Sequence, residues 1–161
     1  MSDQASESTH NTGTPTPETG GTGQGHREVR LVRTGHGEFD VTNVRGGRIH
    51  IGSGETDDFT PVELLLTAIA GCSAVDVDFI TGKRAEPESF DVVASGEKLK
   101  DAVKGNHMGD VSVTFTLRFP DGEDGDRARD MIGKAITMSH DRLCTVSRTV
   151  QLGTPVEMRQ A

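Results

Sequence analysis

The sequence predicts an α+β domain whose strands and helices follow the order β-β-β-α-β-β-α-β. Three observations support this prediction. Short segments in both halves of the chain alternate apolar and polar side chains, which is typical of strands. One continuous apolar segment predicts a central helix, and a later segment with apolar residues three and four positions apart predicts a second helix. The chain has no internal repeat, so we interpret it as one domain with mixed architecture.

The first three predicted strands form a meander. Apolar and polar residues alternate around Val29 and Leu31 and again over residues 38–44. Residues 45–48 read Arg-Gly-Gly-Arg and supply the turn into the third strand, over residues 48–51.

The central helix is predicted over residues 61–80, the most apolar part of the chain. Thr60 is a good N-cap, Pro61 suits the first helical position, and Glu63 completes a capping box with Thr60. Residues 81–84, with one glycine and two cations, are typical of a helix end.

A membrane span is the competing interpretation of this segment. The apolar run over residues 62–75 is too short to cross about 30 Å of hydrocarbon, and Glu63, Asp76 and Asp78 would lie in or near lipid. We therefore expect no membrane partner. Apolar residues nonetheless cover nearly every face of the helix, and one small sheet cannot cover them all. This predicts a homodimer in which the partner covers the remainder.

The second half supplies two further strands, over residues 90–93 and 111–119, joined by a mixed-charge stretch over residues 97–110. A turn over residues 120–125 follows.

The second helix is predicted to be capped by Asp124 or Asp126, with apolar residues at helical spacing as far as Ser139. Residues 145–152 are rich in Thr and Val and predict a final strand.

Residues 1–26 are predicted to be a disordered tail, and residues 27–161 the folded domain. Only Met1 and Ala5 are apolar in the tail, so it cannot bury enough surface to offset its ordering entropy. It holds no apolar stretch and no Lys or Arg, the first of which in the chain is Arg27, and this argues against a secretory or transit signal. We expect the protein to be cytoplasmic.

Charge and cysteine content exclude several classes. The net charge of −8, with no basic cluster, argues against nucleic acid as a partner. Two distant cysteines without a Cys-x-x-Cys pair argue against a disulfide framework or a zinc ribbon. His140 and His107 with the cysteines are a weak metal set, because His140 and Cys144 form the only close pair; we expect no metal and no cofactor.

Two runs resemble the OsmC/Ohr family (osmotically induced protein C and organic hydroperoxide resistance protein). Residues 60–77 read Thr-Pro-Val-Glu followed by an apolar helix with Gly-Cys-Ser, and residues 139–146 contain the second cysteine. The resemblance covers about residues 28–158 and is strongest for the OsmC-like branch. It implies an intertwined homodimer with a long buried central helix. It also implies thiol peroxidase activity, with Cys72 as peroxidatic and Cys144 as resolving cysteine.

The residues alone leave the role of each thiol open. Cys72 lies mid-helix, where a cysteine is often a small buried hydrophobe, and Cys144 could fill a helix–strand junction. A reactive Cys72 needs a depressed pKa, whereas Asp76, four residues on and on the same face, would raise it. A cation from elsewhere must then activate the thiol.

The resemblance implies that an arginine of the N-terminal meander and a glutamate just after the helix-start proline hold the thiolate. Here Val62 follows Pro61 and the acid is Glu63, and nine helical residues turn by about 180°, so Glu63 and Cys72 project from opposite faces. A capping role for Glu63 is therefore favoured over a catalytic one. Of the meander arginines, Arg33 is the candidate.

The resemblance implies organic hydroperoxides as the substrate class, and we expect them to be reduced through a sulfenic acid at Cys72 and a disulfide with Cys144, with a dithiol reductant restoring both thiols. The alternative is a non-catalytic stress or small-ligand-binding protein whose cysteines only pack.

Overall fold

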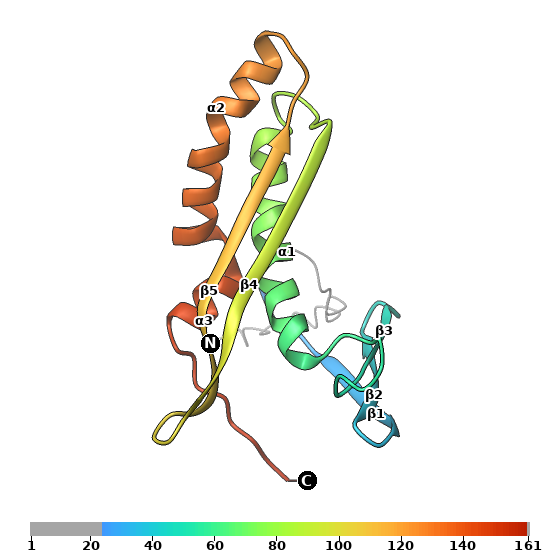
Figure 1. Ribbon diagram of the computed structural model, residues 1–161. Coiled ribbons are helices and arrows are strands. Elements are labelled where there is room, and N and C mark those ends of the chain that lie inside the picture. The colour runs from blue at the N-terminus through green and yellow to red at the C-terminus, as the bar shows by residue number, and fades with distance from the viewer. Residues whose placement is uncertain (1–23, 161) are drawn as a thin grey trace, which may run out of the picture. The chain divides into compact units, whose positions relative to one another are not determined.

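The computed structural model describes residues 24–160, and the chain divides into two compact units, residues 1–58 and 59–161. The predicted tail lies outside the described residues except for its last three. The first unit contains β1 (Val29–Gly35), β2 (Glu38–Asn43) and β3 (Arg48–Ile51) in one antiparallel sheet of order β1-β2-β3 (Figure 1). The predicted meander is confirmed.

The three-stranded sheet buries little of its own surface. Val29 on β1 is 61% exposed and Ile49 on β3 is 52% exposed. Across the sheet, His50 faces Asp40, and its Nδ1 lies 2.7 Å from the Asp40 carboxylate, which raises the His50 pKa. Among the apolar side chains of the three strands only Ile51 is buried, at 6% exposed, so the described part of this unit has little core of its own.

The second unit begins with α1 (Pro61–Thr81), and the predicted start is confirmed in detail. The Glu63 backbone N–H donates to the Thr60 hydroxyl at 3.3 Å, and the Thr60 backbone N–H donates to the Glu63 carboxylate at 2.8 Å. This reciprocal pair satisfies donors that the first helical turn leaves without intrahelical partners. Gly82 is the C-cap residue and remains in a right-handed conformation.

The next two strands are longer than the sequence predicts. The strands β4 (Ser89–Asp101) and β5 (Gly105–Arg118) form one antiparallel hairpin, a long ribbon that runs along α1 (Figure 1). The mixed-charge stretch expected to join them is therefore mostly strand. Its charged side chains are largely solvated, and Asp101 closes the turn by accepting hydrogen bonds from two backbone N–H groups.

The second helix, α2 (Glu123–Met138), begins earlier than predicted. Its N-cap is Gly122, with φ of 116°, and no side chain caps it, so the expected cap at Asp124 or Asp126 is wrong. Both aspartates lie in the first turn instead, where carboxylates interact favourably with the positive end of the helix.

The predicted final strand is wrong, because residues 145–152 are mostly helical. A single π-helical turn, η1 (Ser139–Leu143), follows α2 and leads through Cys144 into α3 (Thr145–Gln151). Val146 and Val150 are four residues apart and share one helical face. Gly153, with φ of 62°, ends the segment as a left-handed glycine does after a helix. Tertiary packing and this glycine outweigh the β-propensity of Thr and Val.

The core of the second unit lies along one face of α1. The four buried residues of this helix are Ile69, Ser73, Val77 and Thr81, and α2, η1, α3 and β4 pack around α1. The other faces of α1 are exposed or half-exposed within the single chain.

By length and composition, α1 could cross a membrane: its mean hydropathy is 1.7 and 22% of its most apolar window is buried. The run over residues 62–75 is only part of this helix, which continues to Thr81, so length alone does not exclude a membrane span. Asp76 and Asp78 lie within this extension, so the objection based on charge still applies.

Candidate dithiol site

The buried thiol of the site belongs to Cys144, between η1 and α3. It is 0% exposed. Its sulfur accepts a hydrogen bond from the Ser147 backbone N–H at 3.3 Å and thereby caps α3, and its thiol points at the Ile69 carbonyl of α1 at 4.0 Å. A buried thiol held by backbone contacts on two elements has a defined position but no direct access for a large substrate.

Cys72 is the more accessible thiol and lies mid-helix on α1, where it is half-buried. Burial raises its pKa most, while a hydrogen bond from the Val146 backbone N–H lowers it. Cys144 and Asp76 raise it further, and the net shift is upward. The predicted effect of Asp76 is confirmed. No cation is among the causes that act on this thiol in the described part of the chain.

The fold brings the two cysteines together from positions far apart in the sequence. Cys144 contributes to the Cys72 pKa both as a hydrogen-bonding and as a charged neighbour, so the thiols lie within interaction distance. Both are free. An accessible thiol beside a buried one could be oxidised first and then form a disulfide with its neighbour.

The raised pKa predicts a steep pH dependence for the reaction of Cys72. Only the thiolate attacks, and below the pKa its fraction rises about tenfold per pH unit. In Arg33→Ala, which lacks the cation proposed to activate the thiol, we expect the rate of iodoacetamide alkylation of Cys72 to keep rising above the ordinary thiol pKa of about 8.5. Asp76→Asn should shift the curve to lower pH, because it removes one negative charge. A curve that levels off below pH 7 would contradict the expectation.

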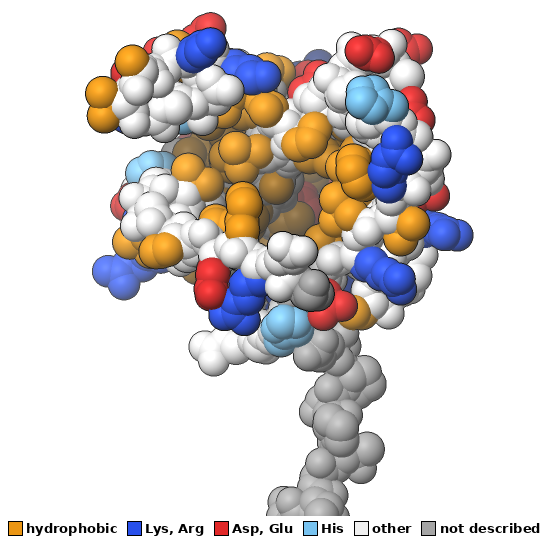
Figure 2. All heavy atoms as spheres, turned by 90° about the horizontal axis from the view of Figure 1, so that it is seen from below, with side chains coloured by type: hydrophobic (Ala, Val, Ile, Leu, Met, Phe, Trp, Pro, Cys, Tyr) orange, Lys and Arg blue, Asp and Glu red, His pale blue; other side chains and the backbone are white. Residues whose placement is uncertain are grey.

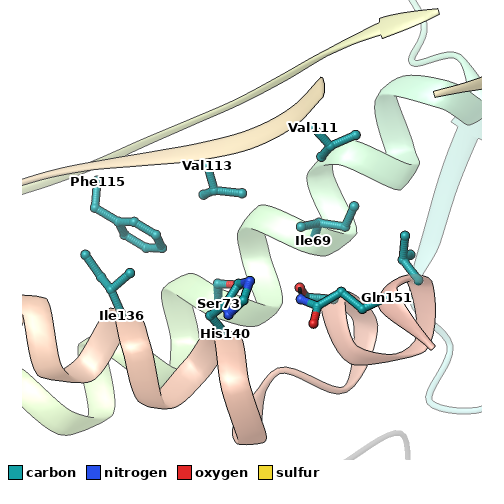
Figure 3. Close-up of a pocket in the computed structure, with 10 residues that line it drawn as sticks. Ile69, Ser73, Val111, Val113, Phe115, Ile136, His140 and Gln151 are labelled. Carbon is teal, nitrogen blue, oxygen red and sulfur yellow. Dashed lines mark hydrogen bonds between the residues drawn. The ribbon is translucent and has the colours of Figure 1, made fainter. Parts of the chain in front are cut away.

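An apolar pocket of about 280 Å³ adjoins the buried thiol. Figure 3 shows Val111, Val113 and Phe115 pointing from β5 toward the helices, with Ile136 of α2 across from Phe115. Polar groups on the helical side come from Ser73, His140, Ser147 and Gln151. Ile69 and Ser147 line the pocket and also contact Cys144, so the cavity lies next to the buried thiol, although neither cysteine lines it.

Glu63 and Arg33 are not brought into this site by any contact of the described residues. Glu63 is engaged by Thr60, whose backbone and hydroxyl hydrogen bonds lower the pKa of the Glu63 carboxyl. Arg33 lies on β1 opposite Phe39, in the first unit. The capping role of Glu63 is confirmed. A catalytic part for either residue stays a prediction.

Two contributors to the site were not predicted from the sequence. The Val146 backbone N–H donates to Cys72 from α3, a segment for which the sequence predicted a strand. The Ser139 hydroxyl donates to the Asp76 carboxylate at 2.8 Å, although the two residues are 63 positions apart. Within residues 24–160, no three His, Cys, Asp or Glu side chains form a group that could hold a metal ion.

A family model described as OsmC-like protein matches residues 52–159, so the chain belongs to the OsmC-like family. An uncharacterised protein of Mycobacterium tuberculosis is 29% identical over 133 residues, which cover 81% of this chain and 93% of that protein.

Solved structures share the α+β fold. The OsmC-like protein of Mycoplasma pneumoniae superposes with a TM-score of 0.63 at 13% identity, over 79% of this chain and 88% of that one. A Legionella pneumophila protein described as organic hydroperoxide resistance protein OsmC gives a TM-score of 0.55 at 15% identity, over 80% and 91%.

Proposed function

We propose that this protein is a thiol peroxidase that reduces organic hydroperoxides through Cys72 and Cys144. One observation carries the proposal: a half-exposed thiol and a fully buried thiol interact beside an apolar pocket. The difference in exposure assigns the roles, because only Cys72 can meet a hydroperoxide directly. Membership of a family that includes a protein described by its resistance to organic hydroperoxides supports the same reaction.

The reaction divides into three balanced steps. The Cys72 thiolate attacks one peroxide oxygen, the O–O bond breaks, and the alcohol leaves after taking a proton, which gives a sulfenic acid at Cys72. Cys144 loses its proton and attacks that sulfur; the S–S bond forms and water leaves. A dithiol reductant then donates two electrons and two protons, and both thiols are restored. No step needs a metal or an organic cofactor.

The pocket supports an apolar substrate. Its walls come from Val111, Val113, Phe115, Ile69 and Ile136, whose burial of an alkyl or aryl group is favourable. Hydrogen peroxide has no apolar group to bury against these side chains, so the pocket does not favour its binding. We therefore expect cumene hydroperoxide to be reduced faster than hydrogen peroxide in an assay with dithiothreitol as reductant. Protein whose thiols have been alkylated is the control, and equal rates for alkylated and untreated protein would reject the proposal.

Activation of Cys72 requires a cation, since its own surroundings raise its pKa. Arg33 of the first unit remains the proposed source of this cation. Glu63 would then orient the arginine while it caps α1. The proposal places the reaction in the cytoplasm, where dithiol reductants are available.

A homodimer is part of this proposal, because α1 carries an exposed apolar stripe. The stripe consists of Leu65, Ala68, Val75 and Phe79, spaced three, seven and four apart as in helices that pack against helices. The second copy must leave Cys72, which lies on the same side of α1, open to substrate. Leu65 is 37%, Val75 47% and Phe79 60% exposed. Figure 2 shows many hydrophobic side chains at the surface. A second copy is a better cover than lipid, because Asp76 and Asp78 adjoin the stripe.

We expect light scattering to give the mass of a dimer at micromolar concentration. Phe79→Glu should yield monomers, since it places a charge in the stripe, whereas Val103→Glu should not. Val103 is 94% exposed at the turn of the β4–β5 hairpin and serves as the matched control. A folded wild-type monomer would contradict the expectation.

The second candidate function is a non-catalytic ligand-binding protein whose cysteines only pack. The raised pKa of Cys72 favours it, because a thiol that stays protonated reacts slowly. The two candidates differ in thiol content after a brief pulse of equimolar hydroperoxide: catalysis consumes both thiols, and a binder keeps them.

A further inference from the structure

Ser139 forms hydrogen bonds both to α1, which carries Cys72, and to Cys144, which follows η1. It is 1% exposed, ends α2 and begins η1. Its hydroxyl donates a hydrogen bond of 2.8 Å to the Asp76 carboxylate on α1. This bond ties the start of the π-helical turn to the helix that carries Cys72.

The backbone of the same residue holds the other cysteine. The Cys144 backbone N–H donates to the Ser139 carbonyl at 3.0 Å, the bond that closes the π-helical turn. π-helical turns inside or beside α-helices occur often at functional sites. Ser139 therefore connects Asp76 and Cys144 through two consecutive hydrogen bonds, one from its side chain and one to its main chain.

Asp76 also has a fixed position relative to Cys72. It lies one helical turn after Cys72, so both side chains share a face of α1. The series Cys72, Asp76, Ser139 and Cys144 is thus joined by one turn of rigid helix and two hydrogen bonds. Loss of the Ser139 hydroxyl would remove this hydrogen-bonded link between η1 and α1, while the contact of the Cys144 sulfur with the Ile69 carbonyl would remain.

We propose that Ser139 and Asp76 are positioning residues, which hold the Cys144 sulfur within reach of the Cys72 sulfur so that the disulfide can close. The inference rests on the proposed pairing of the two cysteines, but not on a hydroperoxide being the oxidant. Any two-electron oxidant that accepts the two thiol protons will form the same bond.

The test measures the effective concentration of the two thiols in the full chain. The protein is equilibrated with reduced and oxidised glutathione, which exchanges two electrons and two protons with the pair, and the disulfide fraction is read by mass spectrometry. We expect Ser139→Ala to lower the effective concentration by about tenfold, the effect of one lost hydrogen bond. Asp76→Ala should lower it similarly, and the double variant no further, because both residues act through one bond.

Two variants separate positioning from a general loosening of the fold. Asp76→Asn keeps an oxygen that can accept from Ser139, so it should stay within about threefold of the wild type. Thr137→Ala removes a hydroxyl that bonds only within α2, two residues earlier, and should change nothing. In Ser139→Ala, Cys144 should remain protected from iodoacetamide, because a folded chain still buries it.

The positioning role would be overturned if Ser139→Ala had the same effective concentration as the wild type. It would also be overturned if the losses in the Ser139→Ala, Asp76→Ala double variant were additive. If Ser139→Ala does not fold, Asp76→Ala and Asp76→Asn decide, and equal values for the two would overturn it. A wild-type chain that closes the disulfide with glutathione but consumes no hydroperoxide would reject the peroxidase and leave the positioning role intact.

Discussion

Cys72→Ser is expected to abolish the reduction of cumene hydroperoxide, to the rate measured without protein. A serine hydroxyl does not ionise at neutral pH and cannot attack the O–O bond, whereas Cys144, which is 0% exposed, has no access to the substrate. The measurement is the initial rate of hydroperoxide loss with dithiothreitol as reductant.

Cys72→Ala provides the control, since it also removes the thiol but leaves an apolar side chain at this position. Both variants should be inactive and should keep the far-UV circular dichroism of the wild type. Reduction by Cys72→Ser at the wild-type rate would reject the mechanism, and reduction by only one of the two variants would show that polarity, and not the thiol, matters.

Cys144→Ser is expected to consume about one hydroperoxide per chain and then stop. Without a second thiol, Cys72 remains a sulfenic acid, which dimedone traps and mass spectrometry detects. The substitution suits the site, because a serine hydroxyl can cap α3 by accepting from Ser147 as the Cys144 sulfur does. The first step should therefore keep its rate while turnover is lost.

Normal turnover of Cys144→Ser with dithiothreitol would remove the resolving role and leave Cys72 as a one-cysteine peroxidase. Absence of both the single turnover and the dimedone adduct would show that Cys144 is needed before the sulfenic acid forms.

Local signals in the sequence predict much of this fold. The Thr60–Glu63 capping box and the three-stranded meander depend on neighbouring residues, and both are present in the structure. The element order is also as predicted as far as α2. Because the capping box fixes where the central helix begins, the position of Cys72 within that helix could also be predicted.

The end of the chain could not be predicted in this way. Propensity favoured a strand for residues 145–152, whereas contacts with α1 and the cap formed by the Cys144 sulfur stabilise a helix. The Ser139–Asp76 bond joins residues 63 positions apart, and no spacing rule indicates such a contact. The Val146 N–H that bonds to Cys72 belongs to the same helix, α3. Because a strand was predicted for residues 145–152, this contact could not be predicted either.

The most direct test of the account is to locate the bond formed after a pulse of one equivalent of cumene hydroperoxide. Peptide mapping without reductant should give one cross-linked peptide that joins Cys72 to Cys144 within a chain, in nearly all molecules, and dithiothreitol should restore both free thiols. Two unmodified cysteines after the pulse, or a disulfide that joins Cys72 of two chains, would contradict the account.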